Sequence, residues 1–238
     1  MPDNPSRLAS FMKALEPDLC YLCGKTLSKP TDKDHIPLKG LFPPEIRKKH
    51  KRTKLITVRV HKACNESYHS DEQYFIYSLY PFAVGTYVGD AMRKYVREKF
   101  RAGKNQKLVA MMMAEFDPRP GGLVLPHNQV VKRFDSKRIE RVLWKIVRGL
   151  HFHHHDNEVL PENWQLSRSF TTRQEPGPPE HFKLFRDLPD NKPLGDYPGV
   201  FTHRLQRFVE AGASFHYWAL LIWDSILVTI QFHDPACT

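Results

Sequence analysis

The sequence predicts an α+β fold with an N-terminal part, residues 1–107, and a C-terminal part, residues 108–238. Residues 55–60, LITVRV, alternate in polarity and are rich in β-branched side chains, which is typical of a strand. Residues 136–150 carry apolar side chains at helical spacing, and the apolar segment 215–232 divides at a Trp-Asp-Ser turn into two strands. A chain of 238 residues can form one large domain or two small ones.

The other elements follow from periodicity and from the positions of proline and glycine. Residues 6–16 predict a helix that Pro17 ends. Residues 73–101 predict a helical region with breaks, and these breaks are expected near Pro81, Gly85 and Gly89. Residues 107–119 fit a strand or a helix, and the Pro- and Gly-rich end of this segment favours the strand. Ser136 is the expected cap of the helix over residues 136–150.

The positive charge of the chain is confined to its N-terminal part. Residues 1–107 hold 21 basic and 11 acidic side chains, whereas residues 108–238 hold 15 of each. This imbalance predicts a polyanionic partner for the N-terminal part. No apolar run approaches the roughly 18 residues of a membrane-spanning helix, and the first ten residues lack a signal-peptide pattern. We therefore expect a cytoplasmic protein with no membrane partner.

Two pairs of metal-binding side chains occur at knuckle spacing. Cys20 and Cys23 form one pair, and His61 and Cys64 form the other. Zinc is commonly bound by two such pairs in a tetrahedron, and a closed Cys₃His shell leaves no position for water. The pattern predicts a structural Zn²⁺ ion. The alternative is that the cysteines are reduced core residues and the histidine lies on the surface.

The segment between the two pairs carries a further pattern. Asp34-His35-Ile36-Pro37 follows the first pair, the predicted strand comes next, and Asn65 follows the last cysteine. In this order the residues resemble the HNH endonucleases, over about residues 18–76. The resemblance implies an N-terminal zinc-stabilised ββα-metal domain with flanking helices over residues 1–107, followed by a mixed α+β domain of unknown role over residues 108–238.

The resemblance assigns roles to individual residues. His35 matches the general base that accepts a proton from the attacking water, and imidazole suits that task near neutral pH. Asp34 and Asn65 match ligands of a catalytic divalent metal, Mg²⁺ or Mn²⁺. His69 lies four residues after Asn65, on the same helical face, and is a further candidate ligand. Taken singly, the Asp-His pair also fits a hydrogen-bonded loop, the Asn a helix cap and His69 a surface histidine.

The sequence departs from the family pattern in two respects. The central Asn that orients the base is missing, because no Asn occurs between Asp34 and Asn65. Thr53, Thr57 or a backbone carbonyl is a candidate replacement. The proline follows His35 by two residues instead of the commoner three.

A run of basic residues lies between the two halves of the pattern. Six Lys or Arg within eight residues predict strong, salt-dependent contact with phosphates, and no aromatic residue in the run suggests base stacking. The run consists of Arg47, Lys48, Lys49, Lys51, Arg52 and Lys54. Alone it also fits a solvated helix face. Beside the HNH-like pattern we interpret it as a nucleic-acid-binding segment, and the resemblance favours DNA over RNA.

The C-terminal half carries no motif with recognisable chemistry. Its histidines at positions 151, 153, 154 and 155 fit a polar helix end better than a second metal site with Asp156 or Glu158. This half is a candidate contact for homo-oligomers.

The sequence thus predicts an endonuclease that hydrolyses phosphodiester bonds, of a family that acts in restriction, mobile-element homing and phage defence. The rival is a zinc-knuckle nucleic-acid-binding module without catalysis, which needs no Asp34-His35 pair. A third interpretation is an interaction or assembly protein whose working part is the C-terminal half.

Overall fold

The computed structural model shows a mixed α+β protein, as the sequence predicts. It describes residues 18–49, 55–103, 105–126, 129–161, 164–172, 185, 197–210 and 213–233. The helix expected over residues 6–16 lies outside these ranges.

Two short strands and a long helix form the part of the fold that carries the sequence motifs. Strand β1 (Thr31–Ile36) pairs with strand β2 (Ile56–His61) in an antiparallel sheet. The 3₁₀ helix η1 (Lys39–Leu41) and helix α2 (Pro44–Lys49) follow β1. Helix α3 (Lys62–Leu79) begins at the residue after β2 ends. The predicted strand in LITVRV is therefore confirmed, and the following helix starts without a linker.

Three helical segments continue the chain after α3. They are η2 (Tyr80–Ala83), α4 (Tyr87–Arg101) and α5 (Gln106–Ala114). The breaks at Pro81 and Gly85 are observed, but Gly89 lies inside α4. A Cβ atom at Gly89 would lie 1.8 Å from the carbonyl oxygen of Ala83, so the backbones approach too closely there for any other residue.

The strand favoured over residues 107–119 is wrong for most of that segment. Helix α5 covers it up to Ala114, and only Phe116–Asp117 are extended, as β3, which pairs with β4 (Val131–Lys132). Leu, Ala, Met, Lys and Gln dominate the segment and have high helix propensity. Met112 is buried, whereas Met111 and Met113 are exposed. The run of apolar residues therefore does not mark a buried strand.

A long helix and a four-stranded sheet follow the β3–β4 pair in the C-terminal part. Helix α6 (Ser136–His154) is capped by Asp135, whose carboxylate accepts a hydrogen bond from the backbone N–H of Arg138, so the expected cap at Ser136 is wrong by one residue. The sheet is antiparallel, in the order β5-β8-β7-β6. Its strands are β5 (Gln165–Thr172), β6 (Phe201–Glu210), β7 (Ala213–Ile222) and β8 (Ile226–His233).

The turn between β7 and β8 forms where the sequence predicts it. Trp223 and Asp224 both have positive φ angles, 53° and 52°, which matches the tight hairpin turns that follow the twist of a sheet. The Trp223 indole N–H donates to the carbonyl oxygen of Leu41 at 2.9 Å, so the tip of this hairpin is bound to η1 of the N-terminal part.

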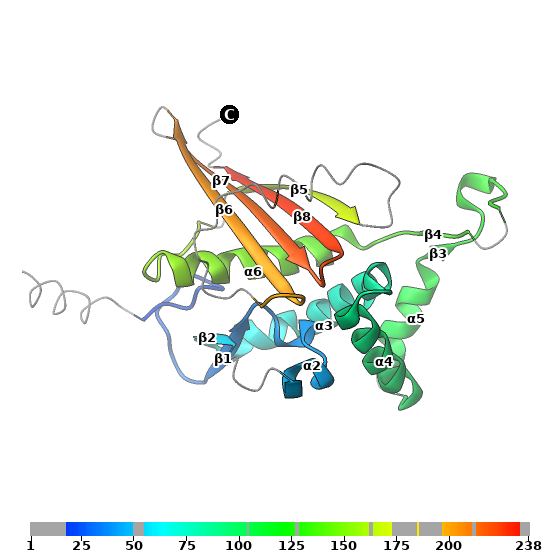
Figure 1. The fold of residues 1–238 in the computed structure, drawn as a ribbon. Helices are drawn as coiled ribbons and strands as arrows, with labels where there is room; N and C mark the ends of the chain where they lie inside the picture. Colours follow the sequence, from blue (N-terminus) through cyan, green and yellow to red (C-terminus); the bar gives the residue numbers. More distant parts are fainter. Residues whose placement is uncertain are drawn as a thin grey trace, which may run out of the picture.

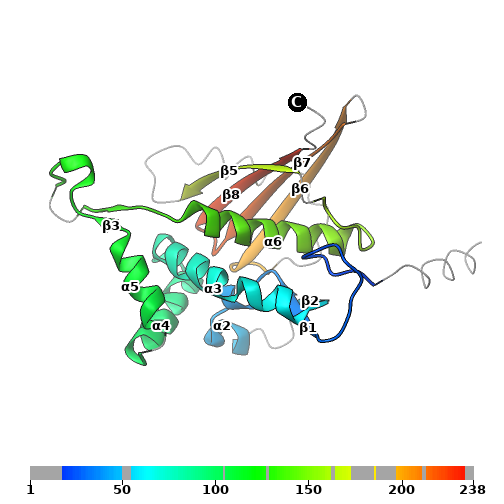
Figure 2. The same cartoon turned by 180° about the vertical axis from the view of Figure 1, so that it is seen from behind.

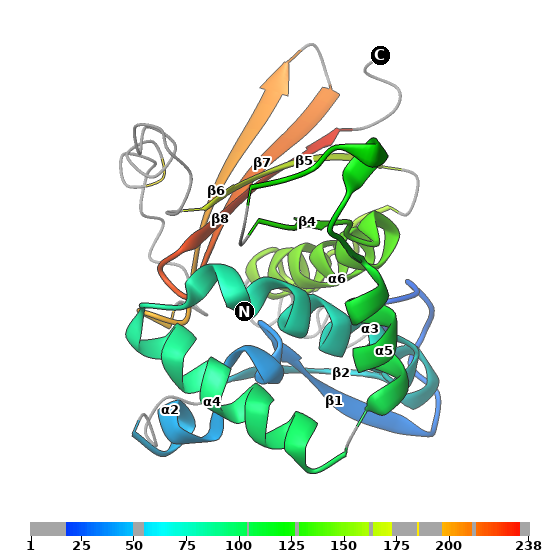
Figure 3. The ribbon, with the colours of Figure 1, turned by 90° about the vertical axis from the view of Figure 1, so that its right-hand side faces the viewer.

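Helix α6 lies between the four-stranded sheet and the layer that contains α3 and the β1–β2 sheet (Figures 1 and 3). Trp144 stacks on Phe232 of β8 with ring centroids 4.7 Å apart, and Arg148 donates to the carbonyl oxygen of Leu22 at 3.1 Å. Seen from behind, α6 again lies between the four-stranded sheet and α3 (Figure 2). One buried hydrophobic cluster includes residues from both sides of positions 107 and 108. The two parts of the chain therefore share a core.

Helix α6 approaches β1 closely at Gly149. A Cβ atom there would lie 2.7 Å from the Ile36 side chain and 3.3 Å from the Tyr21 ring. We predict that Gly149→Val lowers the free energy of unfolding by about 2 kcal/mol, because overpacking forces neighbouring side chains out of place. Urea unfolding measures the change, with Lys137→Val at an exposed position of the same helix as the control. A loss in Gly149→Val no larger than that in the control would contradict this packing.

Candidate functional site

The four predicted zinc ligands converge on one point. The sulfurs of Cys20, Cys23 and Cys64 and one ring nitrogen of His61 all lie within 4.8 Å of one another. Zinc–sulfur bonds of about 2.3 Å and zinc–nitrogen bonds of about 2.0 Å fit a tetrahedral set of this size. The group can hold a structural metal ion such as zinc.

The local backbone explains why these ligands meet. The N–H groups of Cys23 and Gly24 both donate to the carbonyl oxygen of Cys20, and Gly24 takes the positive φ angle of 69° that closes the turn. His61 is the last residue of β2, and Cys64 lies in the first turn of α3. The Nδ1 atom of His61 lies 3.4 Å from the Cys23 sulfur and 3.9 Å from the Cys64 sulfur. Its Nε2 atom lies 3.2 Å from the carbonyl oxygen of Thr26 and 3.1 Å from the backbone N–H of Ser28, so Nε2 is held by the β1 side of the fold while Nδ1 points to the sulfurs.

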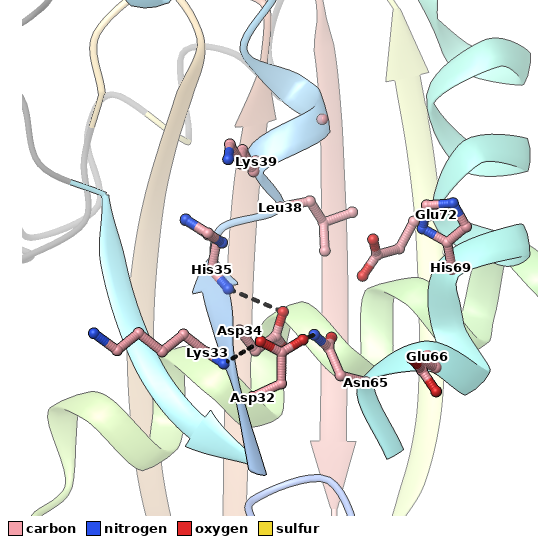
Figure 4. Close-up of a pocket in the computed structure, with 11 residues that line it drawn as sticks. Asp32, Lys33, Asp34, His35, Leu38, Lys39, Asn65, Glu66, His69 and Glu72 are labelled. Atoms are coloured by element: carbon pink, nitrogen blue, oxygen red, sulfur yellow. Dashed lines mark hydrogen bonds between the residues drawn. The ribbon is translucent and has the colours of Figure 1, made fainter. Parts of the chain in front are cut away.

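A polar pocket of about 220 Å³ lies next to this group, between β1 and α3 (Figure 4). Asp34 and His35 line it from β1, and Asn65 and His69 line it from α3. The structure therefore brings these four predicted residues to one cavity. The pocket is also lined by acidic and basic residues to which sequence reasoning assigned no role, namely Asp32, Lys33, Lys39, Glu66 and Glu72.

Asp34 and His35 are neighbours on β1 and differ in burial. Asp34 is buried and faces inward, whereas His35 is half-buried. The backbone N–H of His35 donates to Asp34 at 2.9 Å, and the Tyr21 hydroxyl donates to the same carboxylate. These bonds hold Asp34 in one orientation.

Asn65 connects α3 to β1. Its side-chain amide donates to the carboxylate of Asp32 at 2.9 Å, and its side-chain oxygen accepts from Lys145 at 3.1 Å. His69 is exposed and lies 2.8 Å from the Gln73 side-chain nitrogen. Among the described residues, the cysteine–histidine group is the one set of three or more Cys, His, Asp or Glu side chains with ligand atoms in mutual reach, so His69 does not complete such a set with the carboxylates.

Lys145 is a further residue of the site that sequence reasoning missed. It lies on α6, is 1% exposed, and extends its ammonium group to Asp34 at 3.0 Å and to Glu72. Its spacing along the helix carries no distinct signal. The broader signal is that Arg138, Arg141 and Lys145 recur at three- to four-residue intervals on α6 and face Asp71 and Glu72 on α3, which form ion pairs with them. Asp71 and Glu72 thus form ion pairs with cationic side chains of the C-terminal half.

The pKa values of the pocket residues respond to burial and to neighbouring charges. Burial lowers the pKa of His35 below its ordinary value, and the positive charge of Lys39 lowers it further. The hydrogen bond from Asn65 lowers the pKa of Asp32. Burial raises the pKa of Glu72, although Lys145 acts in the opposite direction. A lowered pKa keeps the His35 imidazole neutral at pH 7, which is the form that accepts a proton.

A threonine lies beside the candidate base on the neighbouring strand. Thr57 lies directly opposite His35 in the β1–β2 register, and directly opposed residues project to the same face of a sheet. Of the two threonines among the predicted replacements, Thr57 is therefore adjacent to the candidate base. Thr53 lies outside the described residues.

The basic run is described only in part. Arg47, Lys48 and Lys49 lie in the last turn of α2, where Lys49 approaches the hydroxyl of Tyr87 at 3.3 Å. The other predicted nucleic-acid-binding residues, Lys51, Arg52 and Lys54, lie outside the described residues.

The histidines of the C-terminal half gather between α6 and the sheet. The ring of His151 lies beside those of His155 and His216, with centroids 4.4 and 5.4 Å apart. Over the described part of the chain they do not form a metal-ligand group of three. Helix α6 ends at His154 with His155 as its cap, so these histidines do lie at a helix end. His151 is buried, however, and burial lowers its pKa to about 3, so the expectation of a polar end is wrong for this residue.

None of the described helices is both long enough and apolar enough to cross a membrane. No protein-family model matches the chain, and searches of curated proteins and of solved structures find no match either.

Loss of one sulfur should release the structural metal. We predict that Cys64→Ser, purified with zinc, retains much less than one equivalent and has a melting temperature lower by roughly 10 °C, because metal binding and folding are coupled. Metal analysis and thermal unfolding measure both quantities, with the exposed Ser70→Ala of the same helix as the control. Full zinc content in Cys64→Ser would contradict the assignment of this ligand.

The pKa of His35 provides a test of the pocket electrostatics that needs no activity. We predict a value below 6.5 in the unmodified protein, and a higher value in Lys39→Met, because removal of a nearby positive charge favours the protonated imidazole. Titration of the ring resonances by NMR measures both values. The control is Lys94→Met on α4, which should leave the His35 pKa unchanged. An unchanged or lower pKa in Lys39→Met would show that Lys39 does not act on this ring.

Proposed function

We propose that this chain is a metal-dependent endonuclease of the HNH type that hydrolyses phosphodiester bonds, with DNA as the preferred substrate. The observation that carries the proposal is the shared pocket, which is lined by Asp34 and His35 from β1 and by Asn65 from α3 and lies beside the cysteine–histidine group. The antiparallel strands β1 and β2, followed directly by α3, support the proposal. The uneven charge supports a nucleic-acid partner, since all the excess positive charge belongs to residues 1–107.

His35 is placed to act as the general base. It is half-buried at the rim of the pocket, and its lowered pKa keeps it neutral at physiological pH. A water molecule held beside Nε2 or Nδ1 would lose its proton to the ring as it attacks phosphorus. The adjacent Lys39 would contribute positive charge close to a bound phosphate.

The oxygen donors of the pocket fit a hard divalent cation. Asp34, Glu72 and Asn65 direct side-chain oxygens at one position, and carboxylate and amide oxygens are the ligands that Mg²⁺ and Mn²⁺ accept. Asp34 and Asn65 would hold the ion, with Glu72 as a further donor. A bound divalent ion would supply positive charge to the pentacoordinate phosphate and to the leaving oxygen. In this structure the ammonium group of Lys145 contacts these same oxygens, so it would compete with the ion for them.

The rival function is binding of nucleic acid without cleavage, and one observation favours it. The ammonium group of Lys145 already satisfies Asp34 and Asn65, so these residues have a structural role that does not need a catalytic metal. The two functions differ in what they require of His35, because binding through basic side chains does not use a neutral imidazole.

Replacement of His35 separates the two functions. We predict that His35→Ala nicks supercoiled plasmid at least about 100-fold more slowly with Mg²⁺ or Mn²⁺, while its affinity for the same DNA changes little, because loss of a general base slows the chemical step alone. The matched control is His153→Ala at the end of α6, away from the pocket, which should cleave normally. Equal cleavage by His35→Ala and the unmodified protein would remove the proposed base, and absence of cleavage by both would favour the binding module.

A further inference from the structure

Lys145 places a positive charge inside the oxygen cage of the candidate catalytic pocket. Its ammonium group lies 3.0 Å from Asp34 and 3.1 Å from the side-chain oxygen of Asn65, and it is also bound to Glu72. The three partners come from β1 and α3, while the lysine comes from α6 in the C-terminal half. The same three oxygens would surround a divalent ion.

Burial makes this group of charges interdependent. Lys145 is 1% exposed and Asp34 is 5% exposed, so each charge needs the other to offset the loss of water. Glu72 adds a second carboxylate, and the Tyr21 hydroxyl adds a hydrogen bond to Asp34. Two carboxylates and one amide oxygen thus surround a single positive charge, a donor set that suits an ion of charge +2 at least as well as an ammonium group.

We propose that Lys145 is a built-in competitor of the catalytic metal. In the metal-free protein its ammonium group occupies the point among the oxygens of Asp34, Asn65 and Glu72, and a divalent ion binds there only when the ammonium group moves away. The ring of Tyr68, 5.2 Å from the Lys145 ammonium, offers that charge a neighbouring aromatic face. The inference rests on the proposed function, since it concerns the metal of that same pocket.

The consequence is a site that is stable without metal and binds metal weakly. Ammonium and metal cannot share the position, because like charges a few ångströms apart repel strongly in a buried site. Lys145 is therefore a positioning residue that acts through Asp34 and Asn65. It also makes the metal affinity of the N-terminal motif depend on a helix of the C-terminal half.

Direct metal binding tests the proposal without nucleic acid. The protein is the full chain loaded with zinc at the cysteine–histidine group, and the probe is Mn²⁺, followed by electron paramagnetic resonance of the free ion. We expect Lys145→Met to bind Mn²⁺ at least about tenfold more tightly than the unmodified protein, because two buried carboxylates lose their counter-charge. Lys137→Met, an exposed lysine of the same helix, should bind Mn²⁺ as the unmodified protein does.

Each outcome of the titration decides the question. An affinity in Lys145→Met equal to or weaker than that of the unmodified protein overturns the proposal, and so does the absence of Mn²⁺ binding in both proteins. Tighter binding by the variant without plasmid cleavage by either protein supports the competition and rejects the nuclease. Cleavage by the unmodified protein with no change in Mn²⁺ affinity rejects the competition and keeps the nuclease.

A second measurement uses the unmodified protein and so does not depend on the folding of the variant. The side-chain ε-carbon resonance of Lys145, assigned by comparison with Lys145→Arg, should shift as Mg²⁺ is added, together with the backbone amide of His35 that is bonded to Asp34. A Lys145 resonance that stays fixed while the His35 amide moves would show that metal binds without displacing the lysine. If neither resonance moves at saturating Mg²⁺, the metal does not enter this cage, and the proposal fails.

Discussion

The arrangement of the N-terminal part depends on the junction between β2 and α3. His61 ends the strand and Cys64 lies in the first turn of the helix, so two ligands of one metal group come from the two sides of this junction. The other two ligands, Cys20 and Cys23, belong to the turn that precedes β1. A metal held by all four ties the start of α3 to both strands. Asn65, the next residue, is thereby set opposite the acidic face of β1.

The C-terminal half contributes to the pocket through charge as well as through packing. Helix α6 buries one face against α3 and β1, and from that face Arg141 and Lys145 reach the acidic residues Asp71 and Glu72. Buried carboxylates require such partners, because an isolated buried charge is strongly destabilising. The division at residues 107 and 108 follows the order of motifs along the sequence. The hydrophobic core does not follow that division, because it contains residues from both parts.

The features that sequence analysis located are those with local causes. The ligand pairs at two-residue spacing, the alternating strand β2, the helix α6 and the β7–β8 hairpin each carry their signal within a few neighbouring residues. The strand was favoured over helix α5 because apolar residues occupy most positions of this segment, although Met112 is its one buried side chain. The sequence therefore shows no helical spacing of apolar residues there. Lys145 was missed for a different reason. Its role depends on residues more than 70 positions away, and no pattern within one helix reports which side chains of another element it will meet.

The hydrogen bond from Trp223 to Leu41 and the close contact at Gly149 have a consequence for how such a protein can evolve. A sequence motif that stabilises itself can be moved between proteins as an independent unit. Here the carboxylates of the motif obtain their counter-ion, and its 3₁₀ helix a hydrogen-bond donor, from segments more than 70 residues downstream. Recombination that exchanged the first hundred residues alone would leave buried acids without a cation, so the two halves are constrained to be inherited together.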